Sequence, residues 1–119
     1  MQTRFLVYLC LGVAALMPAP VAAHAIVLKS SLSEHPIKKG AAESITLYFN
    51  GRIEVKLSRA VLVSRGRADQ PVAMTAGKAP GEVMVQLPAL PPGDYALRYR
   101  VLAADGHVTE ETLPFTVAP

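Results

Sequence analysis

The sequence predicts an all-β fold, namely an antiparallel β-sandwich or small barrel of six or seven short strands. Two observations lead to this prediction. Several runs of β-branched and aromatic residues alternate with polar residues at period two, as half-buried strands do. The segments between these runs are short and rich in glycine, proline and charged residues, and no long window has the periodicity of an amphipathic helix.

Each strand is predicted from its own residues. In "SITLYFN", "EVMVQLP" and "DYALRYRVL" every second residue is a large apolar side chain. The runs "AIVLKS", "RAVLVS" and "ETLPFTV" add three more strands, and we expect "GRIEVKLSR" to be an extended crossing segment. In chain order the predicted strands are 25–30, 44–50, 59–64, 82–88, 94–102 and 111–117, with a weak seventh at 70–74.

The turn before the strand at 94–102 has a recognisable form. Its sequence, "LPPGDY", resembles the tight corner that precedes a late strand in immunoglobulin-like sandwiches. We expect Tyr95 to bury its ring at this corner and to bond its hydroxyl group to nearby backbone. This is a packing role.

The first 23 residues predict a cleaved signal peptide. Arg4 precedes an apolar run from Phe5 to Met17, about a dozen residues, whereas a membrane-spanning helix needs roughly 20. Small residues at Val21 and Ala23 suit the positions that signal peptidase reads, so we expect cleavage before His24. The mature protein would then be a periplasmic domain, residues 24–119, without stable membrane insertion.

The composition of this mature domain excludes several classes of site. It has 96 residues (119 − 23), enough for one small domain. Its lack of cysteine, since Cys10 leaves with the signal, excludes disulfides and thiolate ligands. Without Arg4 its net charge falls from +3 to +2, and its basic residues are scattered without interleaved aromatics, which argues against nucleic-acid binding.

Two of the three histidines are candidate metal ligands. A mature N-terminal His24 would offer the α-amine and imidazole Nδ1 as a chelating pair, and His107 and Asp105 would add a nitrogen and an oxygen. Nitrogen-rich donor sets of this kind suit Cu(II) in a tetragonal plane. In extended backbone Asp105 and His107 would share one face. Gly106 would ease the turn between two strands.

The same residues fit simpler interpretations. Asp-Gly is common in hairpin turns, and a histidine at a cleavage site can arise by chance. His35 lies in a polar loop, where we expect an exposed, non-coordinating side chain. Most of the nearby glutamates are expected to be solvated, although Glu34, Glu110 or Glu111 could accept a hydrogen bond from a ligating imidazole.

Three stretches together resemble the CopC-like periplasmic copper-resistance family. They are "HAIVLKSS", "ITLYFNGRIEVKLSRAVLV" and "LPALPPGDYALRYRVLAADGHVTEETLPFTV". The resemblance implies a seven-stranded antiparallel Greek-key β-sandwich of immunoglobulin or cupredoxin type. It also implies one tightly bound Cu(II) ion per mature chain, with His24, Asp105 and His107 as metal ligands.

The chain departs from the family pattern in places. Tyr99 stands where many members have tryptophan, and "SLSEHPIKKG" replaces a shorter turn. Some members carry a methionine-rich Cu(I) site, but the only methionines after the signal are Met74 and Met84. Because a Cu(I) thioether site typically needs several soft ligands, we interpret both as packing residues and expect a Cu(II)-only protein.

The leading functional hypothesis is a periplasmic, monomeric Cu(II)-binding protein that sequesters or delivers copper, with an inner-membrane transporter of the CopD type as a candidate partner. The alternatives are a copper oxidoreductase of the histidine-brace kind and a metal-free structural sandwich. An oxygenase needs an open equatorial position, which Asp105 would fill. We therefore expect no enzymatic activity.

Overall fold

The computed structural model describes residues 24–33 and 35–119; the predicted signal peptide, residues 1–23, lies outside them. Eight strands and two short 3-10 helices, η1 (Ser31–Ser33) and η2 (Val55–Leu57), make up the described fold. The strands are β1 (Val27–Ser30), β2 (Glu43–Phe49), β3 (Arg59–Ser64), β4 (Gln70–Val72), β5 (Met74–Ala76), β6 (Glu82–Leu87), β7 (Gly93–Leu102) and β8 (Val108–Val117).

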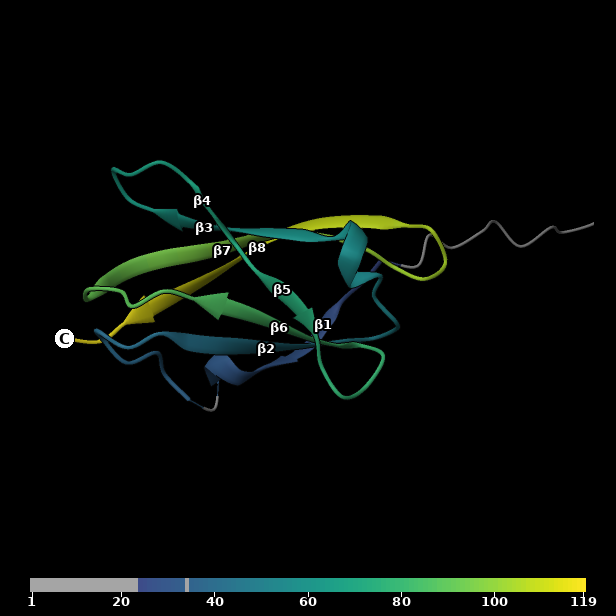
Figure 1. The fold of residues 1–119 in the computed structure, drawn as a ribbon, viewed down its shortest axis with the longest axis horizontal. Coiled ribbons are helices and arrows are strands. Elements are labelled where there is room, and N and C mark those ends of the chain that lie inside the picture. The colour runs from purple at the N-terminus through teal and green to yellow at the C-terminus, as the bar shows by residue number, and fades with distance from the viewer. Residues whose placement is uncertain (1–23, 34) are drawn as a thin grey trace, which may run out of the picture.

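The strands form two four-stranded antiparallel sheets that make a sandwich (Figure 1). The first sheet has the order β1-β2-β6-β5 and the second the order β4-β3-β7-β8. The chain therefore changes sheet after every two strands. The all-β sandwich predicted from the sequence is confirmed.

The predicted number of seven strands is wrong, because the weak strand at 70–74 is two strands. β4 pairs with β3 in the second sheet, whereas β5 pairs with β6 in the first, so the chain crosses between the sheets at Ala73. The backbone oxygen of Ala73 still accepts a hydrogen bond from the Gln86 N–H group at 2.9 Å. When one short run contributes a strand to each of two sheets, its period-two pattern is the same as that of a single strand, so the sequence does not show the crossing.

Two other segments also differ from the prediction. The stretch at 51–59 is not extended throughout, because η2 occupies its second half. The last strand begins at Val108 rather than at 111, and it pairs with β7 over its whole length, from Leu102↔Val108 to Gly93↔Val117. This ten-residue ladder places the β7–β8 turn immediately beside the ends of both strands.

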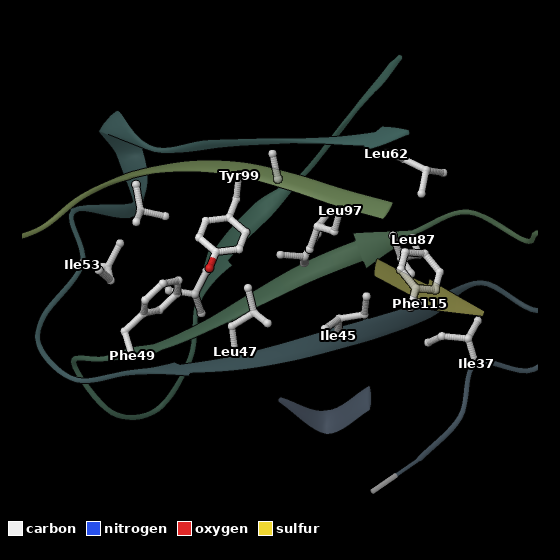
Figure 2. Packing of buried hydrophobic residues seen from close by; sticks show 14 of the residues in the cluster. Ile37, Ile45, Leu47, Phe49, Ile53, Leu62, Leu87, Leu97, Tyr99 and Phe115 are labelled. Atoms are coloured by element: carbon white, nitrogen blue, oxygen red, sulfur yellow. The ribbon is translucent and has the colours of Figure 1, made fainter. Parts of the chain in front are cut away.

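The core lies between the two sheets and contains the inward residues that the alternation predicts (Figure 2). These side chains come from both sheets and interdigitate, as in other sandwiches. The largest side chains that are fully buried are Ile45, Leu47, Leu62, Val83, Val85, Leu97, Val101 and Val117.

Two tyrosines of β7 contribute to this packing. The Tyr95 hydroxyl donates a hydrogen bond to the Pro91 carbonyl at 2.7 Å, and its ring stacks on Phe115 with centroids 5.6 Å apart, as the corner motif predicts. Tyr99 packs edge-to-face on Phe49 at 5.7 Å (Figure 2). Tyr99 thus contributes an aromatic ring to the core, where it is 5% exposed.

The β2–β3 connection closes one end of the sandwich against the end of β7. Ile53 forms an isolated bridge with Ala103, the Glu54 N–H group donates to the Leu102 carbonyl at 2.8 Å, and the Ala104 N–H group donates to the Arg52 carbonyl at 3.0 Å. These bonds hold the start of the β7–β8 turn in place. Among the described residues, no helix is long and apolar enough to cross a membrane.

Candidate metal centre

The β7–β8 turn is closed by its own backbone. The Gly106 N–H group donates to the Ala103 carbonyl at 2.9 Å, and the Ala103 N–H group donates to the His107 carbonyl at 2.9 Å. Gly106 has a φ of 92°, a conformation that favours glycine because other residues would strain their Cβ atom. The role expected for Gly106 is confirmed.

Asp105 and His107 meet because of this turn, and not because they share a face of an extended strand. One carboxylate oxygen of Asp105, Oδ1, accepts the His107 backbone N–H at 3.0 Å. The other, Oδ2, lies 3.0 Å from the His107 Nδ1 atom. The predicted proximity is therefore right, but its expected cause is wrong.

This pairing changes the electrostatics of the turn. The hydrogen bond from the His107 side chain, followed by that from its backbone, lowers the pKa of the Asp105 carboxyl group below its ordinary value. Both side chains remain about half exposed, at 44% for Asp105 and 50% for His107. Because Nδ1 of His107 faces the carboxylate, its Nε2 atom is the ring nitrogen left for another partner.

The N-terminal segment is tied to both sheets. The Ala25 N–H group donates to the Thr109 hydroxyl of β8 at 3.0 Å, in a buried position. The Asn50 side chain, at the end of β2, accepts from the Ile26 N–H group at 3.0 Å and donates to the His24 carbonyl at 3.1 Å. Three polar contacts therefore fix the backbone at the residue that signal cleavage would make the N-terminus.

These contacts bring His24 close to the β7–β8 turn. A shared open pocket of about 230 Å³ has His24 and Asp105 in its lining, together with Asn50, Arg52 and neighbouring backbone of both loops. His107 is not in that lining. It is nevertheless only two residues from Thr109, which holds the segment that carries His24.

The three predicted ligands do not form a finished metal cluster. Nowhere in residues 24–33 and 35–119 do three His, Cys, Asp or Glu side chains come together in a way that would hold an ion. In the uncleaved chain the His24 nitrogen belongs to a peptide bond and cannot act as an amine donor. Two of the four expected donor atoms, an Asp105 oxygen and a His107 nitrogen, are adjacent. The His24 imidazole is present in either form of the chain, whereas the α-amine that would complete its chelate appears only on cleavage.

The two methionines lie on opposite faces of the first sheet. Met74 pairs with Val85, an inward residue, and packs against the core. Met84 pairs with Thr46 and Thr75, one residue out of phase with Val85, so it faces outward. A sheet separates the two sulfur atoms, and they cannot share one ion.

The remaining candidates lie in different places. His35 is exposed and lies two residues before Ile37, which bridges to Val117 at the far end of β8. The nine steps of β8 from Val108 to Val117 separate this end from the β7–β8 turn by about 30 Å. Glu110 faces outward opposite Arg100, and Glu34 lies outside the described residues.

Sequence reasoning did not identify Asn50, Thr109 or Arg52. Thr109 carried a weak signal, because a buried polar residue interrupts the inward apolar positions of β8. Asn50 and Arg52 lie in a loop where no pattern distinguishes them from ordinary turn residues. Arg52 is well exposed, at 68% of its side chain, and lies 3.7 Å from Glu54.

Comparison with known proteins is consistent with this geometry. The family model described as the CopC domain matches residues 27–118. Among solved structures, CopC from Methylosinus trichosporium OB3b is similar at 26% identity and a TM-score of 0.65, covering 81% of this chain and 95% of that one. PcoC, a methionine-rich copper resistance protein from Escherichia coli, is similar at 27% identity and a TM-score of 0.55, covering 80% and 99%. No curated protein sequence matches the chain.

Proposed function

Since this chain belongs to the CopC domain family, we propose that it is a periplasmic protein that binds one Cu(II) ion and sequesters or delivers it. The proposed ligands are the α-amine and imidazole of a mature N-terminal His24, the carboxylate of Asp105 and the imidazole of His107. Signal cleavage before His24 is part of this proposal, and residues 24–119 are its single domain.

The observation that carries the proposal is the tie between Ala25 and Thr109. This buried bond, at 3.0 Å, joins the residue after His24 to the residue two after His107. Residues 84 positions apart are therefore neighbours at the end of the sandwich where Asp105 lies. A hairpin turn is stable without contact to an N-terminal segment, so the bond that fixes the segment carrying His24 beside this turn supports a role for the two segments together.

The chemistry of these donors favours Cu(II). Three nitrogens and one carboxylate oxygen match a tetragonal plane, and the single carboxylate would leave the ion with a net charge of +1. The α-amine has an ordinary pKa of about 7.7–8.0, so a metal ion can displace its proton near neutral pH. Met74 and Met84 face opposite sides of a sheet and offer no second, soft site to Cu(I).

We further propose a carrier, not an enzyme. A carboxylate in the plane would occupy the position that oxygen activation needs, and the contacts between Asp105 and His107 support this role by keeping the two proposed ligands together. A monomer of this kind would exchange copper with a membrane transporter of the CopD type. Copper-loaded protein supplied with reductant and oxygen should show no sustained turnover beyond that of free copper.

The test uses protein exported and processed in cells. Mass spectrometry should show a chain that begins at His24, and electron paramagnetic resonance (EPR) should show one nitrogen-rich tetragonal Cu(II) centre. Three variants are then compared by competition titration: His107→Ala, Asp105→Ala, and a mature chain extended by one residue before His24. Each should lose at least about tenfold in Cu(II) affinity, or roughly 1.4 kcal/mol.

The losses should not add, because all three changes act on one centre. His35→Ala is the matched control, since it removes an exposed imidazole at the far end of β8 and should leave affinity almost unchanged. If His107→Ala and the N-terminal extension both retain wild-type affinity, the β7–β8 turn is an ordinary turn and the copper proposal fails.

A further inference from the structure

A second pocket adjoins His24 on the side of β7 and β8. It has a volume of about 230 Å³, shares His24 and Ala25 with the pocket that contains Asp105, and is otherwise lined by residues that include Tyr99, Thr109 and Glu111. His24 therefore borders two pockets. One contains a proposed metal ligand, and the other contains a carboxylate for which the proposed site has no use.

The register of β8 aims Glu111 toward this second pocket. Glu111 pairs with Tyr99, whose ring is buried in the core, and it lies two residues from Thr109, so all three side chains project from the same face of the second sheet. Glu111 itself remains exposed, because β8 is the edge strand. Burial, followed by the charge of Glu111, raises the pKa of Tyr99, as expected for a carboxylate on the residue paired with that tyrosine.

Glu111 is also an available acceptor. Its carboxylate makes no hydrogen bond or ion pair within the part of the chain that the structure describes. Thr109, two residues earlier on the same face, already holds the Ala25 N–H group. Two residues of strand span roughly 6.7 Å, which the side chains of a glutamate and a histidine can bridge together.

The chelate at His24 would create a need for such an acceptor. Binding through the α-amine and Nδ1 leaves the Nε2–H group of the same ring on the side away from the ion. Imidazoles that bind metals almost always donate this second N–H group to a carboxylate, a carbonyl or water, which fixes the ring and raises its basicity.

We propose that Glu111 is a positioning residue for the His24 imidazole, accepting its Nε2–H bond when Cu(II) is bound. The inference rests on the proposed function and extends it to a residue outside the ligand set. It also assigns different roles to two adjacent glutamates: Glu111 lines the pocket at His24, whereas Glu110 faces outward opposite Arg100.

The experiment compares three variants of the processed, full-length mature chain, with Cu(II) as the probe. Glu111→Leu removes the acceptor, Glu111→Gln keeps an acceptor oxygen without the charge, and Glu110→Leu is the matched control on the other face. Cu(II) affinity of Glu111→Leu should fall about tenfold, the lower end of the usual range for such partners. Glu111→Gln should recover most of this loss, and Glu110→Leu should bind as wild type does.

EPR provides the readout that a purely structural role would not move. The Cu(II) spectrum of Glu111→Leu should shift because the His24 ring is no longer fixed, while the spectra of Glu111→Gln and Glu110→Leu should match wild type. Circular dichroism of the apo proteins checks that all three fold. Equal affinity and identical spectra for Glu111→Leu and wild type would overturn the inference, as would an equal loss in Glu110→Leu.

Failure of this inference is distinct from failure of the proposed function. If the wild-type protein gives no nitrogen-rich Cu(II) spectrum, the copper proposal itself is wrong. If wild type binds Cu(II) as proposed and Glu111→Leu matches it, the site stands and only the role of Glu111 is rejected.

Discussion

The bond between Ala25 and Thr109 offers the sharpest test of how the fold places His24. Thr109→Val keeps the shape of the side chain but removes the hydroxyl that accepts the Ala25 N–H group. Ala25 is 5% exposed and Thr109 is 7% exposed, so water cannot readily replace the lost acceptor. The variant should therefore lose stability and, separately, Cu(II) affinity.

The size of each loss follows from this burial. A buried donor left without an acceptor costs about 1–3 kcal/mol of folding free energy. For a domain of this size, each kcal/mol lowers Tm by about 4–8 °C. The same free energy sets the upper limit on the loss of Cu(II) affinity, about fivefold for each kcal/mol, because the freed segment must be docked again before His24 can chelate.

The assay combines thermal unfolding of the apo protein with competition titration of Cu(II). Thr75→Val is the matched control, since Thr75 lies on β5, is exposed, lines neither pocket at His24 and has no side-chain hydrogen bond within the described residues. A Thr109→Val protein with unchanged Tm and affinity would refute the reasoning. Reduced stability with unchanged affinity would show that the tie supports the fold without positioning His24.

Three further outcomes are expected. In the apo protein, the Asp105 carboxyl followed by carbon NMR should titrate below an ordinary aspartate, and His107→Ala should raise that midpoint; an unchanged midpoint would contradict the pairing. Because this pKa is lowered on folding, the pairing stabilises the fold above the ordinary aspartate pKa and is lost as the pH falls through the lowered value. Replacing Met74 and Met84 with leucine should leave Cu(II) affinity unchanged, and tight Cu(I) binding that disappears in this variant would show that the two residues do form a site. Arg52→Gln should speed Cu(II) association about two- to threefold at low salt and have no effect at 1 M salt, because an exposed cation in the lining of the pocket repels the ion only over an unscreened distance; an effect that persists at 1 M salt would mean that Arg52 acts by another route.

The alternation of apolar and polar residues predicted the buried side chains correctly in strands that belong to a single sheet. The alternation around Ile45, Val85 and Leu97 identified inward residues correctly, because period two has the same meaning in any sandwich. The prediction was wrong at Ala73, where one run supplies both sheets. The point at which the chain crosses between sheets depends on which strands pair with each half of this run. The pairing strands are β3 and β6, which the local sequence of the run does not identify.

The sequence alone determined the donor inventory of this protein: no cysteine after the predicted signal, two methionines, and three histidines, namely His24, His35 and His107. It also determined the β class and the turn at Gly106, because these depend on side-chain chemistry and local backbone preference. Within this inventory, the resemblance of three stretches to a copper-binding family singled out Asp105 as well as His24 and His107.

Only the tertiary structure decided which of these groups are neighbours. The bond from Ala25 to Thr109 joins residues 84 positions apart, and it leaves His24 and Glu111 in the lining of one pocket that does not include Glu110. Such contacts depend on how two sheets pair and stack across the whole domain. The alternation of Leu113, Phe115 and Val117 fixes the face that Glu111 takes, but no local pattern in the sequence says that His24 lies beside that face.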